Sequence, residues 1–206
     1  NMVSIRLIKH IKPDYAQNYI RRFGFEPARN PAYFTLALGA GAVTPLQLAV
    51  GYSIIANGGY YVKPFFIDRI VNNDGKLIRK YEPLQTGNEK FRVIDAKHAF
   101  ILNNILSEVI KNGTGRKARV LRRPDIAGKT GTTNNAVDAW FAGYQPTLTA
   151  ITWFGFDSPK SLGKNQTGSA VALPFWIDFM KEALKDVPVS FVPEPYGIIR
   201  INNNLY

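Results

Sequence analysis

Apolar residues recur with helical spacing in five stretches of the chain. The clearest is Thr44-Pro45-Leu46-Gln47 and the residues after it, because Thr44 can cap a helix, Pro45 suits its first position and Gln47 completes a capping box. The first stretch is apolar on enough positions to predict a mostly buried helix. The predicted helices span residues 2–11, 13–23, 44–56, 95–111 and 174–184.

Three later stretches instead alternate apolar and polar residues, as strands with one buried face do. Residues 126–132, 139–144 and 148–156 are separated by short turns, which predicts three successive antiparallel strands. A further hairpin is expected where residues 60–71, rich in β-branched and aromatic types, meet the turn Asn72-Asn73-Asp74-Gly75 and residues 76–81. The first half of the chain is thus predicted to be mainly helical, and the second half to form an antiparallel sheet that a returning helix covers. This order predicts an α+β fold, an antiparallel sheet with flanking helices.

Polar segments separate these elements. Residues 82–90 are polar and expected to be mobile, and residues 157–168 form a polar loop. The end of the chain is proline-rich and closes on Asn202-Asn203-Asn204, so it is a poor candidate for chemistry. We therefore expect one domain over residues 1–187 and a tail over residues 188–206.

Composition narrows the function classes. The 206 residues are 46% hydrophobic, enough for a sizeable core, and include no cysteine, so no disulfide is possible. Lysine and arginine number 26 against 15 acidic residues, which favours acidic partners such as nucleic acid or anionic lipid, although scattered charges are more often a solvated surface. No apolar run approaches the ~20 residues that span a bilayer.

No metal or cofactor is predicted. His, Asp and Glu residues do not cluster with the spacing of metal ligands. His10 and His98 lie on predicted helices without a Gly-x-Ser-x-Gly sequence nearby, so a catalytic triad is not expected from either.

The strongest candidate for chemistry is residues 127–133, Ala-Gly-Lys-Thr-Gly-Thr-Thr. Lys129 supplies a positive charge, and Thr130 and Thr132 would point to the same side of an extended strand. Gly131 lies between them and has no Cβ, so a ligand or a second backbone could lie against the strand. This pattern predicts a strand edge that holds a carboxylate or an oxyanion.

Two other interpretations of the same residues were considered. A glycine-rich turn before a hairpin fits the composition equally well and stays open. A phosphate-binding loop does not fit, because Arg123 occupies the position of its first glycine and the residues after Lys129 do not favour a helix.

Residues 128–133, followed by residues 138–144, resemble the third active-site motif and next strand of class A penicillin-binding proteins, in which Lys-Thr-Gly is a known signature. The resemblance continues through nearly the whole chain in order. The other matching segments are Leu38-Gly39, Thr44-Pro45-Leu46-Gln47, Ala56-Asn57-Gly58-Gly59-Tyr60, Gly113-Thr114-Gly115-Arg116 and Ala172-Leu173-Pro174-Phe175-Trp176.

The resemblance also implies what lies outside the chain. Asn1 resembles the asparagine of the second motif, Ser-x-Asn, whose serine would precede residue 1. The nucleophilic serine and the lysine of the first motif, Ser-x-x-Lys, would lie further upstream in the parent chain. We therefore expect the C-terminal part of a transpeptidase domain of a bifunctional synthase. Its glycosyltransferase domain and membrane anchor would lie outside these residues, with the domain on the periplasmic side of the bacterial inner membrane.

The implied activity is serine acyl transfer from D-Ala-D-Ala stem peptides of peptidoglycan, which β-lactams inhibit by acylating the same serine. The resemblance assigns Lys129, Thr132 and Asn1 to catalysis. Lys129 would assist proton transfer, the Thr132 N–H would bind the oxyanion and Asn1 would orient the substrate amide. It assigns Thr130, Gly131, Thr132 and Thr133 to substrate binding.

Two rival functions remain. A serine β-lactamase or D,D-carboxypeptidase would use the same pocket with water as the acceptor. A basic module that binds nucleic acid or another polyanion would instead depend on residues 116–123, although no nucleic-acid motif of a usual kind is present.

Overall fold

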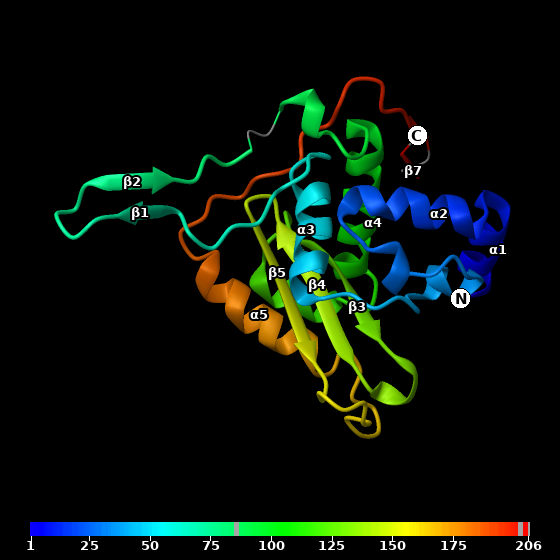
Figure 1. The fold of residues 1–206 in the computed structure, drawn as a ribbon. Helices are drawn as coiled ribbons and strands as arrows, with labels where there is room; N and C mark the ends of the chain where they lie inside the picture. The colour runs from blue at the N-terminus through cyan, green and yellow to red at the C-terminus, as the bar shows by residue number, and fades with distance from the viewer. Residues whose placement is uncertain (85–86, 202–203, 206) are drawn as a thin grey trace.

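Three antiparallel strands form the central sheet, as the alternating pattern predicts (Figure 1). They are β3 (Ala127–Thr132), β4 (Ala139–Gln145) and β5 (Leu148–Phe154), and they lie in the order β3-β4-β5. The candidate motif therefore occupies an edge strand. An edge strand leaves half of its backbone hydrogen-bonding groups without a strand partner.

The computed structural model describes residues 1–84, 87–201 and 204–205. Its α-helices are α1 (Met2–Ile11), α2 (Pro13–Ile20), α3 (Pro45–Ala56), α4 (Ala96–Lys111) and α5 (Ala172–Ala183). Short 3-10 helices are η1 (Arg21–Phe23), η2 (Pro27–Arg29), η3 (Phe34–Leu38), η4 (Glu89–Phe91), η5 (Arg116–Leu121) and η6 (Asn134–Ala136). Two further strand pairs join β1 (Arg69–Val71) to β2 (Leu77–Lys80) and β6 (Arg200–Ile201) to β7 (Asn204–Leu205).

Helices cover both faces of the sheet. On one face Tyr144 and Ala127 pack with Ile55 of α3, and on the other Phe141 meets Trp176 of α5 edge to face at 4.9 Å. Helix α4 contributes to both clusters and lies against β3. The predicted α+β fold is therefore confirmed, and the sheet is held rigidly from both sides.

The predicted capping box at the start of α3 is also confirmed. The Thr44 hydroxyl accepts from the Gln47 N–H at 3.1 Å, and the Gln47 side-chain oxygen accepts from the Thr44 N–H at 3.0 Å. This reciprocal pair satisfies two of the amide donors that a helix start leaves free.

Helix α1 is present, but the prediction that it is mostly buried is wrong. Ile8 alone is buried there, while Met2 and Val3 are 67% and 69% exposed. The helical spacing of apolar residues indicates which face of a helix is hydrophobic. It carries no information on whether another element covers that face.

The hairpin at Asn72-Asn73-Asp74-Gly75 is confirmed, and the Asn72 side-chain oxygen accepts from the Asp74 and Lys76 N–H groups. Its first strand is shorter than predicted, because within residues 60–71 only β1 is a strand and Tyr60 makes one isolated bridge to Arg92. The hairpin projects from the body of the domain, so no packed layer extends its strands (Figure 1).

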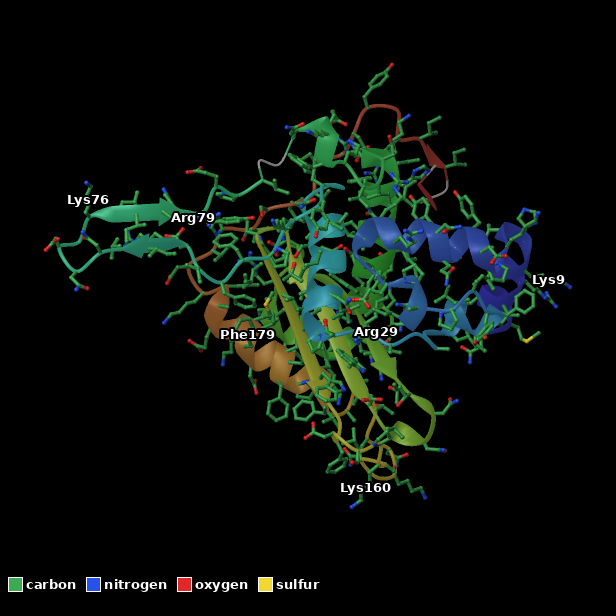
Figure 2. The ribbon with its side chains drawn as sticks, in the orientation of Figure 1. Lys9, Arg29, Lys76, Arg79, Lys160 and Phe179 are labelled. Atoms are coloured by element: carbon green, nitrogen blue, oxygen red, sulfur yellow. The ribbon has the colours of Figure 1, made fainter. Side chains whose placement is uncertain are left out.

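The labelled basic side chains do not gather on one face (Figure 2). Lys9 lies on α1, Lys76 and Arg79 on the projecting hairpin and Lys160 on the loop after β5, at well-separated ends of the molecule (Figure 2). This distribution fits a solvated basic surface better than a continuous polyanion-binding groove.

The start of the predicted tail is tied to the domain by a buried carboxylate. Asp125 accepts from Arg123 at 2.9 and 2.7 Å and from the Ser190 N–H at 3.0 Å. Gln145 of β4 donates to both Asp125 and the Ser190 hydroxyl. The boundary at residues 187/188 stays a prediction. Parts of the predicted mobile segment 82–90 and of the terminal asparagine run lie outside the described residues.

The Asp125 network generates a stability prediction. Burial alone would raise the pKa of Asp125, but hydrogen bonds from Arg123, Ser190 and Gln145 outweigh it and hold the pKa below its ordinary value. Asp125→Asn leaves the largely buried Arg123 without its partner, so we expect a loss of about 3 kcal/mol in urea unfolding at pH 7. Asp157→Asn, at an exposed position, is the matched control and should change little.

The pH dependence follows from the sign of the shift. A carboxyl group with a lowered folded pKa contributes stability that is fully present above its unfolded pKa, about 3.9, and is lost as the pH falls through the folded value. The difference between wild type and Asp125→Asn should therefore shrink below pH 4. A difference that stays constant from pH 7 to pH 2 would contradict this account.

Candidate functional site

The second half of β3 forms an open strand edge. Ala127 and Gly128 are buried, whereas Lys129 and Thr132 are exposed. Across the following turn the Thr133 N–H donates to the Asp138 carbonyl at 3.1 Å. Backbone groups of an antiparallel strand alternate in direction, so those of Thr130 and Thr132 point away from β4. The Thr132 N–H is therefore aimed at the open edge.

Thr130 and Thr132 present their hydroxyls on one face, as predicted, since they pair with Phe141 and Ala139. The Thr132 hydroxyl oxygen accepts from the Gly168 N–H at 3.0 Å. The Thr130 hydroxyl lies 2.6 Å from the Thr114 hydroxyl. Each hydroxyl thus has one partner from a flanking loop and keeps further hydrogen-bonding capacity for a ligand.

The Lys129 side chain bends around the same edge of β3, so that its ammonium group lies beside Thr130. Lys129 pairs with Ala142, which places its Cβ on the face opposite the threonines, yet its Nζ donates to the Thr130 carbonyl at 2.9 Å and lies 3.4 Å from the Thr130 hydroxyl. None of the ion pairs among the described residues includes Lys129. Desolvation of the ammonium group lowers the pKa of Lys129 below its ordinary value.

Gly131 allows close packing against the neighbouring strand. A Cβ at this position would lie 3.1 Å from the Cβ of Trp140, its partner on β4. Trp140 is half-buried and packs on Trp153, with ring centroids 5.7 Å apart. Phe141 and Tyr144 are fully buried, so Trp140 is the aromatic residue of β4 nearest to a rim position.

Thr133 contributes to the turn after β3. Its hydroxyl accepts from the Asp138 N–H at 2.7 Å and lies 3.4 Å from the Asp138 carboxylate, which also accepts from the Trp153 ring N–H at 2.9 Å. These bonds give Thr133 and Asp138 a structural role in closing the turn. The predicted contact of Thr133 with substrate stays a prediction.

Asn1 precedes α1, is exposed and makes no side-chain cap, and α1 packs against η3 and α2. Among the described residues, no hydrogen bond joins Asn1 to β3. The role of Asn1 in orienting a substrate amide therefore also stays a prediction.

Thr114 and Gly168 contact the motif although the site prediction did not include them. Thr114 lies between Gly113 and Gly115. A Cβ added at Gly113 would lie 2.9 Å from Val109 of α4, and one added at Gly115 would lie 2.9 Å from Ile110 and 3.2 Å from Val109. The loop therefore packs tightly against the end of α4. The Gly-Thr-Gly sequence was a usable signal for Thr114. Gly168 lies in a polar loop, and nothing in its local sequence distinguishes it.

The spacing Ser-x-x-Lys also occurs within the chain, at residues 161–164. These residues lie in the loop after β5 and not on a helix. The Ser161 hydroxyl donates to the Asn135 carbonyl at 2.7 Å and accepts from the Gly163 N–H. Ser161 is therefore a loop-forming residue, and no hydrogen bond within the described part of the chain joins it to Lys129.

Two recesses of the described surface lie away from the motif. One is lined around Arg21, Arg22 and Lys90 and the other around Phe100 and Phe191, and neither includes a residue of β3. Among the residues that the structure describes, no group of three His, Asp or Glu side chains could hold a metal ion.

Comparison with known sequences decides the family. Residues 1–181 match the family profile described as the penicillin-binding protein transpeptidase domain. The chain belongs to this family. Penicillin-binding protein 1A of Neisseria lactamica is 45% identical over 206 residues, which cover the whole chain and 26% of that protein. Penicillin-binding protein 1A of Pseudomonas aeruginosa is 37% identical and aligns with 98% of the chain and 30% of its own length.

Solved structures agree with the family assignment. The crystal structure of penicillin-binding protein 1A from Haemophilus influenzae superposes with a TM-score of 0.89 at 32% identity, over 97% of this chain and 35% of that one. The chain thus spans about a quarter of the length of the curated relatives it matches. Within the described residues, no helix of the chain is both long and apolar enough to cross a bilayer.

The desolvated environment of Lys129 predicts that its ammonium group titrates at a lower pH than a solvated lysine does. Its lowered pKa should appear as a titration midpoint below the ordinary lysine value of about 10.4. The midpoint can be measured by carbon-13 NMR of lysines labelled at Cε, with the Lys129 signal assigned by its loss in Lys129→Ala. A midpoint at or above the ordinary value would mean that an unrecognised anion compensates the desolvation.

Proposed function

We propose that the chain is the C-terminal part of the D,D-transpeptidase unit of a bifunctional peptidoglycan synthase. In this proposal a serine outside residues 1–206 attacks D-Ala-D-Ala stem peptides, and β-lactams acylate the same serine. One observation carries the proposal. The Lys129 ammonium group, the hydroxyls of Thr130 and Thr132 and the outward Thr132 N–H meet at one open strand edge.

This edge suits the terminal carboxylate of the donor peptide. Hydroxyl donors and an unpaired ammonium group within a few ångströms of one another form charge-assisted hydrogen bonds with a carboxylate. Thr130 and Thr132 lie two residues apart on one face, so both hydroxyls can reach the same anion. We propose that they bind the carboxylate of the peptide or of a β-lactam.

The same edge suits an oxyanion. The Thr132 N–H points away from β4, and a backbone donor fixed in a sheet needs no reorganisation as negative charge develops on the carbonyl oxygen. We propose that it is one of the two oxyanion donors, the other being the N–H of the serine outside this chain. Because it is a backbone group, side-chain substitution at position 132 does not remove it.

Lys129 has the properties that proton transfer requires. A lysine whose pKa is lowered by desolvation holds its proton less tightly than a solvated lysine does. We propose that Lys129 assists a serine of the second motif, outside these residues, in passing a proton to the leaving amine. The parent enzyme would work on the periplasmic side of the bacterial inner membrane, as expected from its penicillin-binding protein 1A relatives.

Covalent labelling of the longer parent protein with fluorescent penicillin tests these roles. We expect Lys129→Ala to lower the second-order rate constant of acylation about 100-fold or more, as losing a proton-transfer group does. Thr132→Val should lower it roughly 10- to 100-fold, because a hydrogen bond to a charged group is lost. Lys164→Ala, in an exposed loop, is the matched control and should label as the wild type does.

Labelling that survives Lys129→Ala and Thr132→Val in combination would refute the assigned roles. The acceptor is decided separately, by incubating the parent protein with lipid-linked, stem-peptide substrate. D-Ala release with cross-linked product supports a transpeptidase. D-Ala release with hydrolysed product alone would indicate a D,D-carboxypeptidase, and turnover of the penicillin itself a β-lactamase.

A further inference from the structure

The β5–α5 loop, residues 155–171, folds back onto the turn that follows the motif. The Ser161 hydroxyl donates to the Asn135 carbonyl at 2.7 Å, and the Leu162 N–H donates to the Ala136 carbonyl at 2.8 Å. The Gly168 N–H donates to the Thr132 hydroxyl at 3.0 Å. The loop is therefore bound at three places, two of them in the β3–β4 connection and the third at Thr132 of β3, a site residue.

The turn that the loop holds is conformationally costly. Asn135 and Ala136 have φ values of 59° and 50°, and a left-handed conformation is unfavourable for alanine in particular. Such residues persist where surrounding contacts determine them. The two hydrogen bonds from Ser161 and Leu162 supply such contacts.

Gly168 is buried directly against the backbone of the sheet. A Cβ there would lie 2.3 Å from the Trp140 carbonyl oxygen and 2.4 Å from the Gly131 carbonyl oxygen. Gly131 and Trp140 form a pair and direct their side-chain positions to the opposite face, so their backbone is bare where the loop meets it. No residue with a side chain fits at position 168 without moving the loop away from Thr132.

This contact decides how the Thr132 hydroxyl can act. A hydroxyl has one donor and two acceptor sites, and the Gly168 N–H occupies an acceptor site. The proton of the Thr132 hydroxyl takes no part in this hydrogen bond and is available for donation to another group. Among the described residues, the Gly168 N–H is the one hydrogen-bond partner found for this hydroxyl.

We propose that Gly168 is a positioning residue, which fixes the Thr132 hydroxyl as a hydrogen-bond donor toward the carboxylate of the bound peptide or β-lactam. The inference rests on the proposed function. Gly168 itself touches no ligand. It acts through Thr132, and the fit of the loop against Gly131 and Trp140 makes the orientation rigid before a ligand arrives.

A double-mutant cycle on the longer parent protein tests this role, with the acylation rate constant for fluorescent penicillin as the readout. Gly168→Ala should lower that constant roughly five- to tenfold in the wild-type background, the effect of losing one neutral hydrogen bond. In the Thr132→Val background, where the hydroxyl is absent, Gly168→Ala should lower it less than twofold. Ala170→Ser, which adds one atom to an exposed residue of the same loop, is the matched control.

Equal losses from Gly168→Ala in both backgrounds would overturn the proposal, since they would show general damage to the fold. No loss in the wild-type background would also overturn it. Thr132→Ser keeps the hydroxyl and should preserve the sensitivity to Gly168→Ala.

A second measurement is independent of acylation. Hydrogen exchange of the parent protein, followed by mass spectrometry on peptides containing Gly168, should show faster exchange in Thr132→Val than in the wild type or Thr132→Ser. If this contrast is present but no variant is acylated by penicillin, the proposed function fails while the Gly168–Thr132 contact stands. If exchange is the same in all three proteins, the contact itself is refuted.

Discussion

The site depends on β3 being an edge strand. A strand with neighbours on both sides would use the Thr130 and Thr132 backbone groups for pairing, and no donor would remain for a ligand. At the edge, these groups have no strand partner, and the long Lys129 side chain curls around so that its Nζ donates to the Thr130 carbonyl. The other residues of the domain keep this edge exposed yet rigid.

Rigidity comes from opposite packing layers. Tyr144 and Ala127 are fixed against α3, and Phe141 is fixed against Trp176 of α5, so β4 can shift toward neither layer without opening a cavity. Gly128 and Gly143 pair where an added Cβ would collide with neighbouring atoms at 2.7 Å, so the Phe141 and Trp176 rings pack directly against the backbone there. The motif is thereby held by a core that is built before any ligand binds.

Local sequence was sufficient for much of this account. Thr44 and Gln47 predict the start of α3, and the Asn-Asn-Asp-Gly turn predicts the β1–β2 hairpin. The alternation around Lys129 predicts an edge strand with two threonines on one face. What failed were inferences about tertiary surroundings. The apolar pattern of α1 could not show that most of that helix is uncovered, and β-propensity in residues 60–71 could not supply a sheet to extend.

Of the two loop contacts of the site, Thr114 was marked by its Gly-Thr-Gly sequence, whereas Gly168 had no local signal. Gly168 meets Thr132 at a sequence separation of 36 residues, because the chain passes through β4, β5 and a long loop before it returns. Thr133 belongs to the motif and its hydroxyl bonds to Asp138 in the turn, while its contact with substrate stays a prediction. The presence of a residue in the motif indicates the kind of chemistry expected at the site. Whether its hydroxyl faces a ligand or bonds within the protein can be decided only from its contacts in the three-dimensional structure.

The most direct test of the central claim is a crystal structure of the parent protein acylated by a penicillin. The account predicts that the acyl carbonyl oxygen lies about 2.7–3.1 Å from the Thr132 backbone nitrogen. It also predicts that the penicillin carboxylate accepts from the Thr130 and Thr132 hydroxyls. An acyl group that turns its carbonyl oxygen away from β3, with the carboxylate bound elsewhere, would contradict it.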